Sequence, residues 1–284
     1  MFTFFHPGTT FPALSITGGE CELNCLHCGH HYLTGMEGIT DPEALKTRLL
    51  ALAEDGGIGA LISGGSTKDG VVPLGPFIPV LAEIKRETDL VLNVHTGFIE
   101  REEAEALAKA GVDIVSLDVV GARETIQKIY GLNRGPGDYR LTINRLKEAG
   151  IPNIVPHITV GLHKGMLYGE YNAIRIISQA CKPEAIVINV MIPTKGTSLS
   201  NAPVISNKNV CAIIEYAATL IDAPVYLGCM RPKGDSSLEM EAEDVGISGI
   251  VLPTKEGRKE IERRRETTDR KSCCAVVPAF PGSK

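Results

Sequence analysis

The 284-residue chain lacks tryptophan, has few other aromatic residues and carries no excess of basic charge. Its 7 phenylalanines and 7 tyrosines are too few for an aromatic platform that stacks nucleic-acid bases. The net charge is 29 − 34 = −5, which argues against nucleic acid or an acidic membrane surface as a partner. No apolar run reaches the ~18 residues of a membrane span, and residues 1–10 lack a signal-peptide pattern. The sequence therefore predicts a soluble, cytoplasmic protein that binds neither nucleic acid nor membrane.

The composition fits a folded chain with a substantial core, because 43% of the residues are hydrophobic and 22% are charged. Short apolar, β-prone runs alternate with amphipathic helical stretches along the chain. The predicted strands are 13–17, 60–63, 91–94, 112–117, 154–160, 185–191, 225–227 and 249–252. The predicted helices are 41–54, 74–88, 100–110, 139–149, 170–180, 207–221 and 255–267.

About eight strands that alternate with helices are typical of a parallel (β/α) barrel of the TIM type, complete or nearly complete. This α/β barrel is predicted over residues 1–254. An open doubly wound sheet is the alternative, because periodicity alone does not show closure. Residues 255–284 are predicted as a charged C-terminal helix and a peripheral, partly mobile tail with a cysteine pair. In a barrel, the chemistry is expected at the carboxyl ends of the strands.

Eight cysteines in a chain of this size, without an export signal, favour a metal cluster over a set of disulfides. Three of them lie within eight residues, two are adjacent near the C-terminus, and three are scattered. In that order they are Cys21, Cys25 and Cys28; Cys273 and Cys274; and Cys181, Cys211 and Cys229.

The loop 21–28 directly follows the predicted strand 13–17. Three thiolates on one loop can bind three irons of a [4Fe–4S] cube, which leaves the fourth iron open to a small molecule. A structural zinc site is an alternative, in which His27, His30 or His31 supplies the fourth ligand. A chance grouping of buried cysteines is a further alternative.

The spacing C-x3-C-x2-C after a first strand resembles the radical S-adenosylmethionine (radical SAM) superfamily. His27 stands where that motif usually carries an aromatic residue. Ser63, Gly64, Gly65 and Ser66 stand where the superfamily has a Gly-Gly-Glu motif, whose backbone holds the methionyl amino group. Ser66 departs from the glutamate, so the resemblance assigns that contact to the backbone. An ordinary tight turn is the other interpretation of the two glycines.

Two later segments resemble the biotin synthase-like branch of this superfamily. Residues 189–198 resemble its sixth-strand region, and residues 227–234 resemble its seventh-strand region, where an arginine enters the barrel. The sequences of residues 11–18 and 32–36 are similar to the corresponding segments of archaeal-type biotin synthase homologues. That group includes the subunits of a two-component lipoyl synthase, in which two radical SAM proteins place two sulfurs on an octanoyl chain. The resemblance covers about residues 13–252.

The resemblance implies a [4Fe–4S] cluster held by Cys21, Cys25 and Cys28, with S-adenosylmethionine chelated to its open iron. Reductive cleavage would then yield a 5′-deoxyadenosyl radical that abstracts hydrogen from an unactivated carbon. The implied reaction is sulfur insertion into a protein-bound octanoyl chain. The implied partners are a low-potential electron donor such as ferredoxin, a second radical SAM subunit and an octanoylated carrier protein or domain.

Two alternatives stay open at this point. A biotin synthase-like enzyme could act on a free small molecule as a mutase or in cofactor biosynthesis, for which polar anchors inside the barrel are expected. A protein-bound acyl chain would instead need an apolar channel and an outer docking face. A non-enzymatic iron–sulfur or zinc protein is the alternative from another class.

Polar residues at the predicted strand ends are the candidates for binding S-adenosylmethionine and substrate. Besides Ser63, Gly64 and Gly65, they are Asn93, His95, Asp118, His157, Asn189, Met191 and Arg231. Asp118 could accept the ribose hydroxyls or cap the next helix, and His157 could be a core histidine. Arg231 could pair with a carboxylate.

The remaining cysteines raise the question of a sulfur donor. Cys229 follows a predicted strand, and a folded-back tail could bring Cys273 and Cys274 near it to bind an auxiliary [4Fe–4S] cluster. Surface thiols on a mobile tail are the alternative. Cys181 and Cys211 fall in helical stretches and are expected to be small buried apolar residues.

Overall fold

The strands form one curled parallel sheet, so their carboxyl ends all lie on the same side. The computed structural model describes residues 1–234 and 236–276. Across these residues the sheet order is β11-β1-β10-β9-β8-β7-β6-β5-β4-β2-β3, and every pairing is parallel. The strands are β1 (Phe2–Phe5), β2 (Ala13–Ser15), β3 (Glu37–Gly38), β4 (Gly59–Ser63), β5 (Val91–His95), β6 (Ile114–Asp118), β7 (Asn153–Val160), β8 (Ile186–Val190), β9 (Val225–Leu227), β10 (Gly249–Val251) and β11 (Thr267–Arg270).

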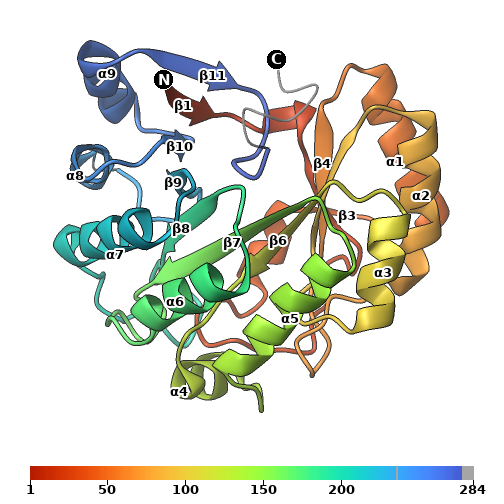
Figure 1. Ribbon diagram of the computed structural model, residues 1–284, viewed down its shortest axis with the longest axis horizontal. Helices are drawn as coiled ribbons and strands as arrows, with labels where there is room; N and C mark the ends of the chain where they lie inside the picture. The colour runs from red at the N-terminus through yellow and green to blue at the C-terminus, as the bar shows by residue number, and fades with distance from the viewer. Residues whose placement is uncertain (235, 277–284) are drawn as a thin grey trace.

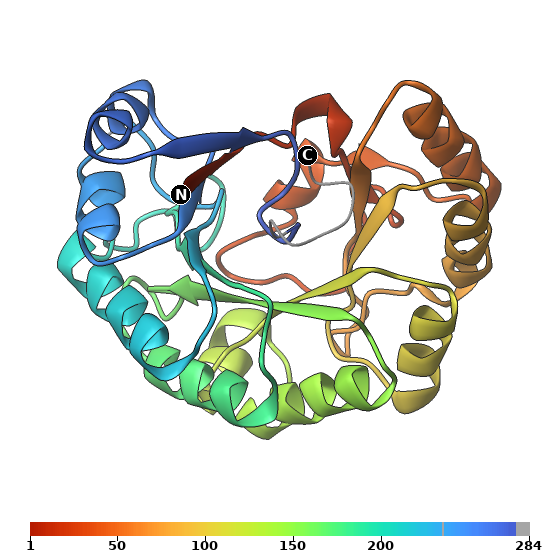
Figure 2. The ribbon, with the colours of Figure 1, turned by 45° about the horizontal axis from the view of Figure 1, so that its top comes forward.

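The sheet curls into a horseshoe that stays open between its two edge strands, and the helices cover its outer side (Figures 1 and 2). This arrangement confirms the predicted parallel (β/α) barrel in its nearly complete form. The helices are α1 (Pro42–Glu54), α2 (Ile78–Glu87), α3 (Arg101–Lys109), α4 (Arg123–Thr125), α5 (Pro136–Glu148), α6 (Glu170–Ala180), α7 (Asn207–Leu220), α8 (Ser237–Asp244) and α9 (Lys255–Arg264). In the described part of the chain, no helix is both long and apolar enough to cross a membrane.

Local sequence explains how each helix packs on the sheet, as α1 illustrates. The Asp41 side chain accepts a hydrogen bond from the Ala44 N–H at 2.9 Å, and Pro42 occupies the first helical position, where no N–H is needed. Leu45, Leu49 and Leu52 recur at helical spacing and are buried. The helix therefore starts at its cap and turns one apolar stripe toward the strands.

Two strands at one end of the sheet, β1 and β11, were not predicted from the sequence. β1 has the sequence Phe-Thr-Phe-Phe and is buried at all four positions, including the polar Thr3. It lies between β10 and β11, where both of its edges are paired. β11 consists of polar residues and pairs with β1 in register from Phe2–Thr267 to Phe5–Arg270. Its position depends on β1, which no local pattern of its own residues reveals.

The segment after β11 enters the space enclosed by the strands instead of lying outside the barrel (Figure 2). Cys274, Ala275 and Val276 are buried against inward-facing residues of the sheet. Those residues include Phe5, Val91, Ile114, Val155, Val187 and Tyr226. The expectation of a peripheral tail is therefore wrong for residues 272–276, because the apolar Cys-Cys-Ala-Val run fills the amino-terminal end of the barrel. Residues 277–284 lie outside the described residues.

Candidate functional site

A cavity of about 570 Å³ occupies the barrel interior. Side chains from the carboxyl halves of five neighbouring strands, β4 to β8, line its wall. They are Ser63, Asn93, His95, Ser116, Asp118, His157, Thr159 and Asn189. Cys21, Cys25 and Cys28 lie in the lining as well, and so do Cys229, Cys273 and Cys274. One cavity thus collects both sets of thiols that the sequence singles out.

The cysteine loop is held in place by bonds within itself and to two distant segments. Cys28 N–H and Gly29 N–H both donate to the Cys25 carbonyl, at 3.0 and 2.9 Å. The His30 Nε2 lies 2.9 Å from the Leu23 carbonyl, and His30 itself adopts a left-handed backbone with φ of 65°. Leu26 donates to Ile129 O and accepts from Leu199 N–H, at 2.9 and 3.1 Å. The loop therefore presents its thiols from a fixed backbone.

The Gly-Gly turn after β4 packs directly against this loop. Ser66 N–H donates to Cys21 Sγ at 3.2 Å, and Glu22 N–H donates to Ser66 O at 2.8 Å. A Cβ added at Gly65 would lie 2.0 Å from the Glu20 carbonyl oxygen and 2.6 Å from Cys21 Cβ. Only glycine permits this approach, so Gly65 does more than form an ordinary tight turn.

The three thiols lie on one short loop, which suits three irons of a polynuclear cluster. Among the described residues, no three His, Cys, Asp or Glu side chains come together in the arrangement that would hold one metal ion. Burial, followed by the neighbouring Cys28 and Cys21, raises the pKa of Cys25 to about 12. Because burial and the neighbouring thiols both oppose its ionisation, a cationic centre would favour Cys25 as a thiolate.

The histidines of the zinc alternative differ in their surroundings. His30 bonds to the Leu23 carbonyl, and His31 packs edge-on against Tyr32 with centroids 5.8 Å apart. His27 is buried, with its ring centroid 5.4 Å from that of Tyr130, and its Nδ1 has no hydrogen-bond partner. Desolvation lowers the pKa of His27 to about 4, against the opposing field of Asp118. Of these rings, His27 thus keeps a ring nitrogen without a hydrogen bond.

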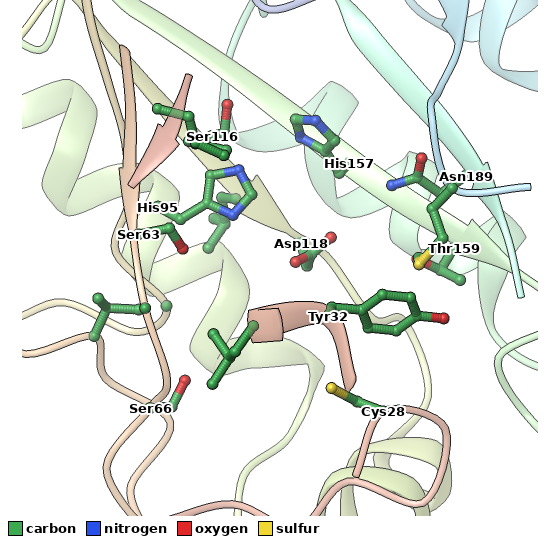
Figure 3. A pocket seen from close by; sticks show the side chains of 18 of the residues that line it. Cys28, Tyr32, Ser63, Ser66, His95, Ser116, Asp118, His157, Thr159 and Asn189 are labelled. Atoms are coloured by element: carbon green, nitrogen blue, oxygen red, sulfur yellow. The ribbon is translucent and has the colours of Figure 1, made fainter. Parts of the chain in front are cut away.

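A polar belt crosses the middle of the cavity, formed by His95, Asp118, His157 and Asn189 (Figure 3). The ring centroids of His95 and His157 are 5.6 Å apart, and His157 Nδ1 lies 3.0 Å from the Val155 carbonyl. Desolvation lowers the pKa of both imidazoles, that of His95 to about 4, although Asp118 acts in the opposite direction. Both rings are therefore neutral at neutral pH.

Asp118 ends β6 and is exposed to the cavity. The next helix, α4, has Ala122 as its N-cap and no side-chain cap bond, so Asp118 is not a helix cap. Asn93, which also lines the cavity, is buried, and its Oδ1 accepts a hydrogen bond from Ser116 Oγ at 2.9 Å. Asp118 is thus free to accept hydrogen bonds from a ligand.

The second set of thiols lies inside the barrel. Cys273 Sγ is 3.7 Å from Asn93 Nδ2, Cys274 is buried, and Cys229 is exposed to the cavity they share. Burial raises the pKa of Cys273 to about 11 and also raises that of Cys274 above its ordinary value. The alternative of surface thiols on a mobile tail is therefore wrong for Cys273 and Cys274. Cys211 is buried in α7 as expected, while Cys181 follows α6 and is half-buried.

Two predicted binding residues do not reach the cavity. Met191 is 1% exposed and is not part of the lining, and its N–H donates to Val160 O at 2.9 Å. The Arg231 guanidinium is also 1% exposed and pairs with Glu239 at 2.6 Å. It donates further to Gly228 O and Val251 O, at 2.6 and 2.8 Å. The carboxylate partner of Arg231 is thus one of the chain's own.

Several lining residues were missed by sequence reasoning. Ser116 could have been found, because it precedes Asp118 by two residues on the same face of β6. Tyr130 and Tyr139 also line the cavity. Tyr130 ends a short π-helix, Ile126–Tyr130, and no sequence pattern places it near the cysteine loop.

Comparisons with known proteins agree with this geometry. A family model described as the radical SAM superfamily matches residues 15–165, which is more than half of the chain. A biotin synthase from Burkholderia thailandensis is 26% identical over 271 residues, covering 88% of this chain and 77% of the relative.

Solved structures share the fold at low identity. Methylornithine synthase (PylB) superposes with a TM-score of 0.63 at 13% identity and covers 89% of this chain and 73% of its own. The FeFe-hydrogenase maturase HydG from Carboxydothermus hydrogenoformans gives 0.60 at 20% identity, with 88% and 58% covered. The chain therefore spans little more than half the length of that maturase.

Proposed function

Because the chain belongs to the radical SAM superfamily, we propose that it cleaves S-adenosylmethionine reductively at the cysteine-loop end of this cavity. Cys21, Cys25 and Cys28 would hold the [4Fe–4S] cluster of that superfamily. When bound, the cluster and S-adenosylmethionine supply a radical that abstracts hydrogen from an unactivated carbon. The chain itself orients these groups and keeps water from the reacting atoms.

We propose partners in the cavity wall for two parts of S-adenosylmethionine, the methionyl amino group and the ribose. The turn formed by Ser63, Gly64 and Gly65 presents backbone groups beside the cysteine loop, as a methionyl amino group requires. The carboxylate of Asp118 is available to accept the ribose hydroxyls. Asn189 and His157 complete the same belt. The role of the turn is what the resemblance to the superfamily implies, and that of Asp118 rests on its position and hydrogen-bonding capacity.

The observation that carries the reaction class is the placement of Cys229, Cys273 and Cys274 in the same cavity as the cysteine loop. We infer that these three thiols hold an auxiliary iron–sulfur cluster that donates sulfur. The adjacent Cys273 and Cys274 could bind neighbouring irons of such a cluster, with Cys229 as a third ligand. A substrate between the two ends would lose hydrogen at one side and gain sulfur from the other.

For the substrate we propose a protein-bound octanoyl chain, so that the chain would be one component of a lipoyl synthase. This substrate requires an octanoylated carrier protein or domain, and the second sulfur would come from a second radical SAM subunit. A low-potential donor such as ferredoxin would deliver the electron. The similarity to biotin synthases supports the branch of the superfamily to which this reaction belongs.

A second candidate is a reaction on a free small molecule, as a mutase or in cofactor biosynthesis. The observation that favours it is the polar belt of His95, Asp118, His157 and Asn189, which could anchor polar groups of such a substrate. The two candidates differ in where the substrate is attached and in whether the product gains sulfur.

The test is an anaerobic assay with dithionite, S-adenosylmethionine and an octanoylated carrier peptide, with and without a candidate partner subunit. Mass spectrometry follows 5′-deoxyadenosine and any thiol on the peptide. We expect both products from the wild type, and only 5′-deoxyadenosine from Cys273→Ser. Cys211→Ser, in a buried thiol outside the cavity, is the matched control and should behave as the wild type. An unmodified peptide alongside 5′-deoxyadenosine would favour the small-molecule candidate.

A further inference from the structure

Half of the large hydrophobic side chains that the described residues expose lie on one part of the surface. There are eight such side chains, and four of them are Met166, Tyr168, Tyr171 and Val204, which are 52, 45, 39 and 57% exposed. The first three lie in the loop after β7 or in the first turn of α6, and Val204 lies in the loop between β8 and α7. We call these four residues the rim patch. A contiguous exposed apolar surface of this kind marks an interaction site.

The two loops that carry the rim patch touch each other. A Cβ added at Gly165 would lie 2.0 Å from the Pro203 carbonyl oxygen, so the two parts of the patch are adjacent. The ring centroid of Tyr171 is 5.0 Å from that of Tyr216 in α7, and α6 and α7 are neighbours on the outer side of the sheet (Figures 1 and 2). The patch therefore lies at the carboxyl ends of β7 and β8, two of the strands that line the cavity.

The backbone that presents the rim patch is fixed from inside the protein. Glu170 is buried, and its two carboxylate oxygens accept from Gly161 N–H and Tyr168 N–H, at 2.9 and 2.7 Å. His163 Nδ1 lies 2.9 Å from Thr125 Oγ1, which joins the same loop to α4. A loop that is already ordered loses little conformational entropy when a partner binds. The patch is thus preorganised for docking.

The rim patch is flanked by cations, although the net charge of the chain is −5. Residues 163–175 and 203–208 contain Lys164, Arg175 and Lys208 and one carboxylate, that of the buried Glu170. The three cations are exposed, and none of them forms an ion pair with another described residue. Charge complementarity therefore favours a partner that carries carboxylates around an apolar centre. A second copy of this chain would bring the same cations to a two-fold interface, where they would repel each other.

We propose that the rim patch is the docking surface of an acidic carrier domain, whose carboxylates meet Lys164, Arg175 and Lys208. Tyrosine and methionine, which supply three of the four patch residues, are enriched at the centres of protein interfaces. This inference rests on the proposed function, because a carrier-bound acyl chain is the substrate that requires an outer docking face. A domain docked on this patch stands beside the cavity that its acyl chain must enter.

The test is isothermal titration calorimetry of the anaerobically reconstituted protein with a folded, octanoylated carrier domain of net negative charge. Lys164→Glu combined with Lys208→Glu should weaken binding at least about 10-fold, and Met166→Ser about 5-fold. Two exposed positions outside the patch supply matched controls, Lys259→Glu in α9 and Leu220→Ser at the end of α7. Both controls should bind the domain as the wild type does, and circular dichroism checks that each variant is folded.

Salt provides a second measurement. An increase from about 50 to about 500 mM NaCl should weaken binding to the wild type at least about 10-fold, and binding to the double charge variant much less. Equal affinities of the wild type and the folded patch variants, or no binding of the domain to the wild type, would overturn the proposal. A dimer of this chain that Met166→Ser dissociates would assign the patch to a second copy instead. Sedimentation with anionic phospholipid vesicles that only the double charge variant loses would assign it to a membrane.

The same proteins separate this proposal from the proposed function. Thiol formation on the short octanoylated peptide tests the reaction without a docked domain. Sulfur on that peptide, together with equal affinities for the carrier domain, rejects the docking surface and leaves the reaction in place. Carrier binding that depends on the rim patch, without any thiol on the peptide, supports the docking surface and rejects sulfur insertion.

Discussion

At the scale of single residues, the site depends most on Gly65, where the turn after β4 touches the cysteine loop. Gly65→Ala would force a Cβ to within 2.0 Å of the Glu20 carbonyl oxygen. We expect the unfolding free energy of this variant to be about 1–3 kcal/mol lower than that of the wild type. The variant should also incorporate less iron during anaerobic reconstitution. Gly19→Ala is the control, because its Cβ would meet nothing within 4 Å. Equal iron content in both variants would contradict this role.

His95 provides a prediction about pH. A histidine whose pKa falls from 6.5 to about 4 on folding contributes stability above pH 6.5 that is lost as the pH falls toward 4. His95→Gln removes this titration, so the variant should lose less unfolding free energy over that window. The difference should be about 1–2 kcal/mol, since the ring also borders the cavity. Urea unfolding at pH 7 and pH 4.5 measures it, and parallel losses in both proteins would refute it.

The site residues that could be predicted were those whose spacing indicates a metal-binding motif or whose place is the end of a predicted strand. The motif of Cys21, Cys25 and Cys28 and the polar strand ends at His95, Asp118 and His157 all line the cavity. Arg231 could not be assigned in the same way, because its partner Glu239 comes from a helix that the sequence did not predict. A charged side chain near a strand end does not reveal which way it turns.

At the scale of elements, the pair of Arg231 and Glu239 joins the loop after β9 to α8 and to Thr254 at the start of α9. Glu239 also accepts from Thr254 N–H and Oγ1–H, at 3.0 and 2.7 Å. Arg231→Met leaves a buried carboxylate without its cation and should lower the unfolding free energy by about 3–5 kcal/mol.

The double variant Arg231→Met with Glu239→Gln should recover part of that loss, because no buried charge then remains unpaired. Urea unfolding of the wild type, the two single variants and the double variant gives the coupling free energy between Arg231 and Glu239. If Arg231 instead bound substrate, Arg231→Met would change substrate KM and leave the unfolding midpoint in place, which would contradict the structural role.

The segment 271–276 is the element that sequence patterns described least well. Val276 is fully buried among inward-facing residues of the barrel. Val276→Ala should therefore lower the unfolding free energy by about 1–3 kcal/mol. Lys271→Ala, at an exposed position of the same segment, is the control. An unchanged midpoint for Val276→Ala would mean that this segment does not fill the barrel in solution.

The helices and central strands could be predicted because each carries a periodic pattern of apolar residues, and these residues are the ones it buries. β8, buried at every position, and α6, with its apolar stripe, follow the expected ranges within a residue. β1 and β11 could not, because β1 is short and buried at every position, while β11 consists of polar residues. Their pairing is decided by residues more than 260 positions apart, which local periodicity does not encode.

At the scale of the whole molecule, the open horseshoe explains why the two ends of the chain meet the site. The open edge lies between β11 and β3, and the chain passes from β11 into the interior there (Figure 2). The chain after β11 thus brings Cys273 Sγ to 3.7 Å from Asn93 Nδ2, in the cavity that the cysteine loop also lines.

The central claim is that the cysteine loop supports reductive cleavage of S-adenosylmethionine. The most direct measurement is 5′-deoxyadenosine formed by anaerobically reconstituted protein with dithionite, with iron and sulfide determined in the same sample. We predict about four irons at the loop cluster, product from the wild type, and none from Cys25→Ala. An intact cluster that forms no 5′-deoxyadenosine, or zinc bound in place of iron, would contradict the account.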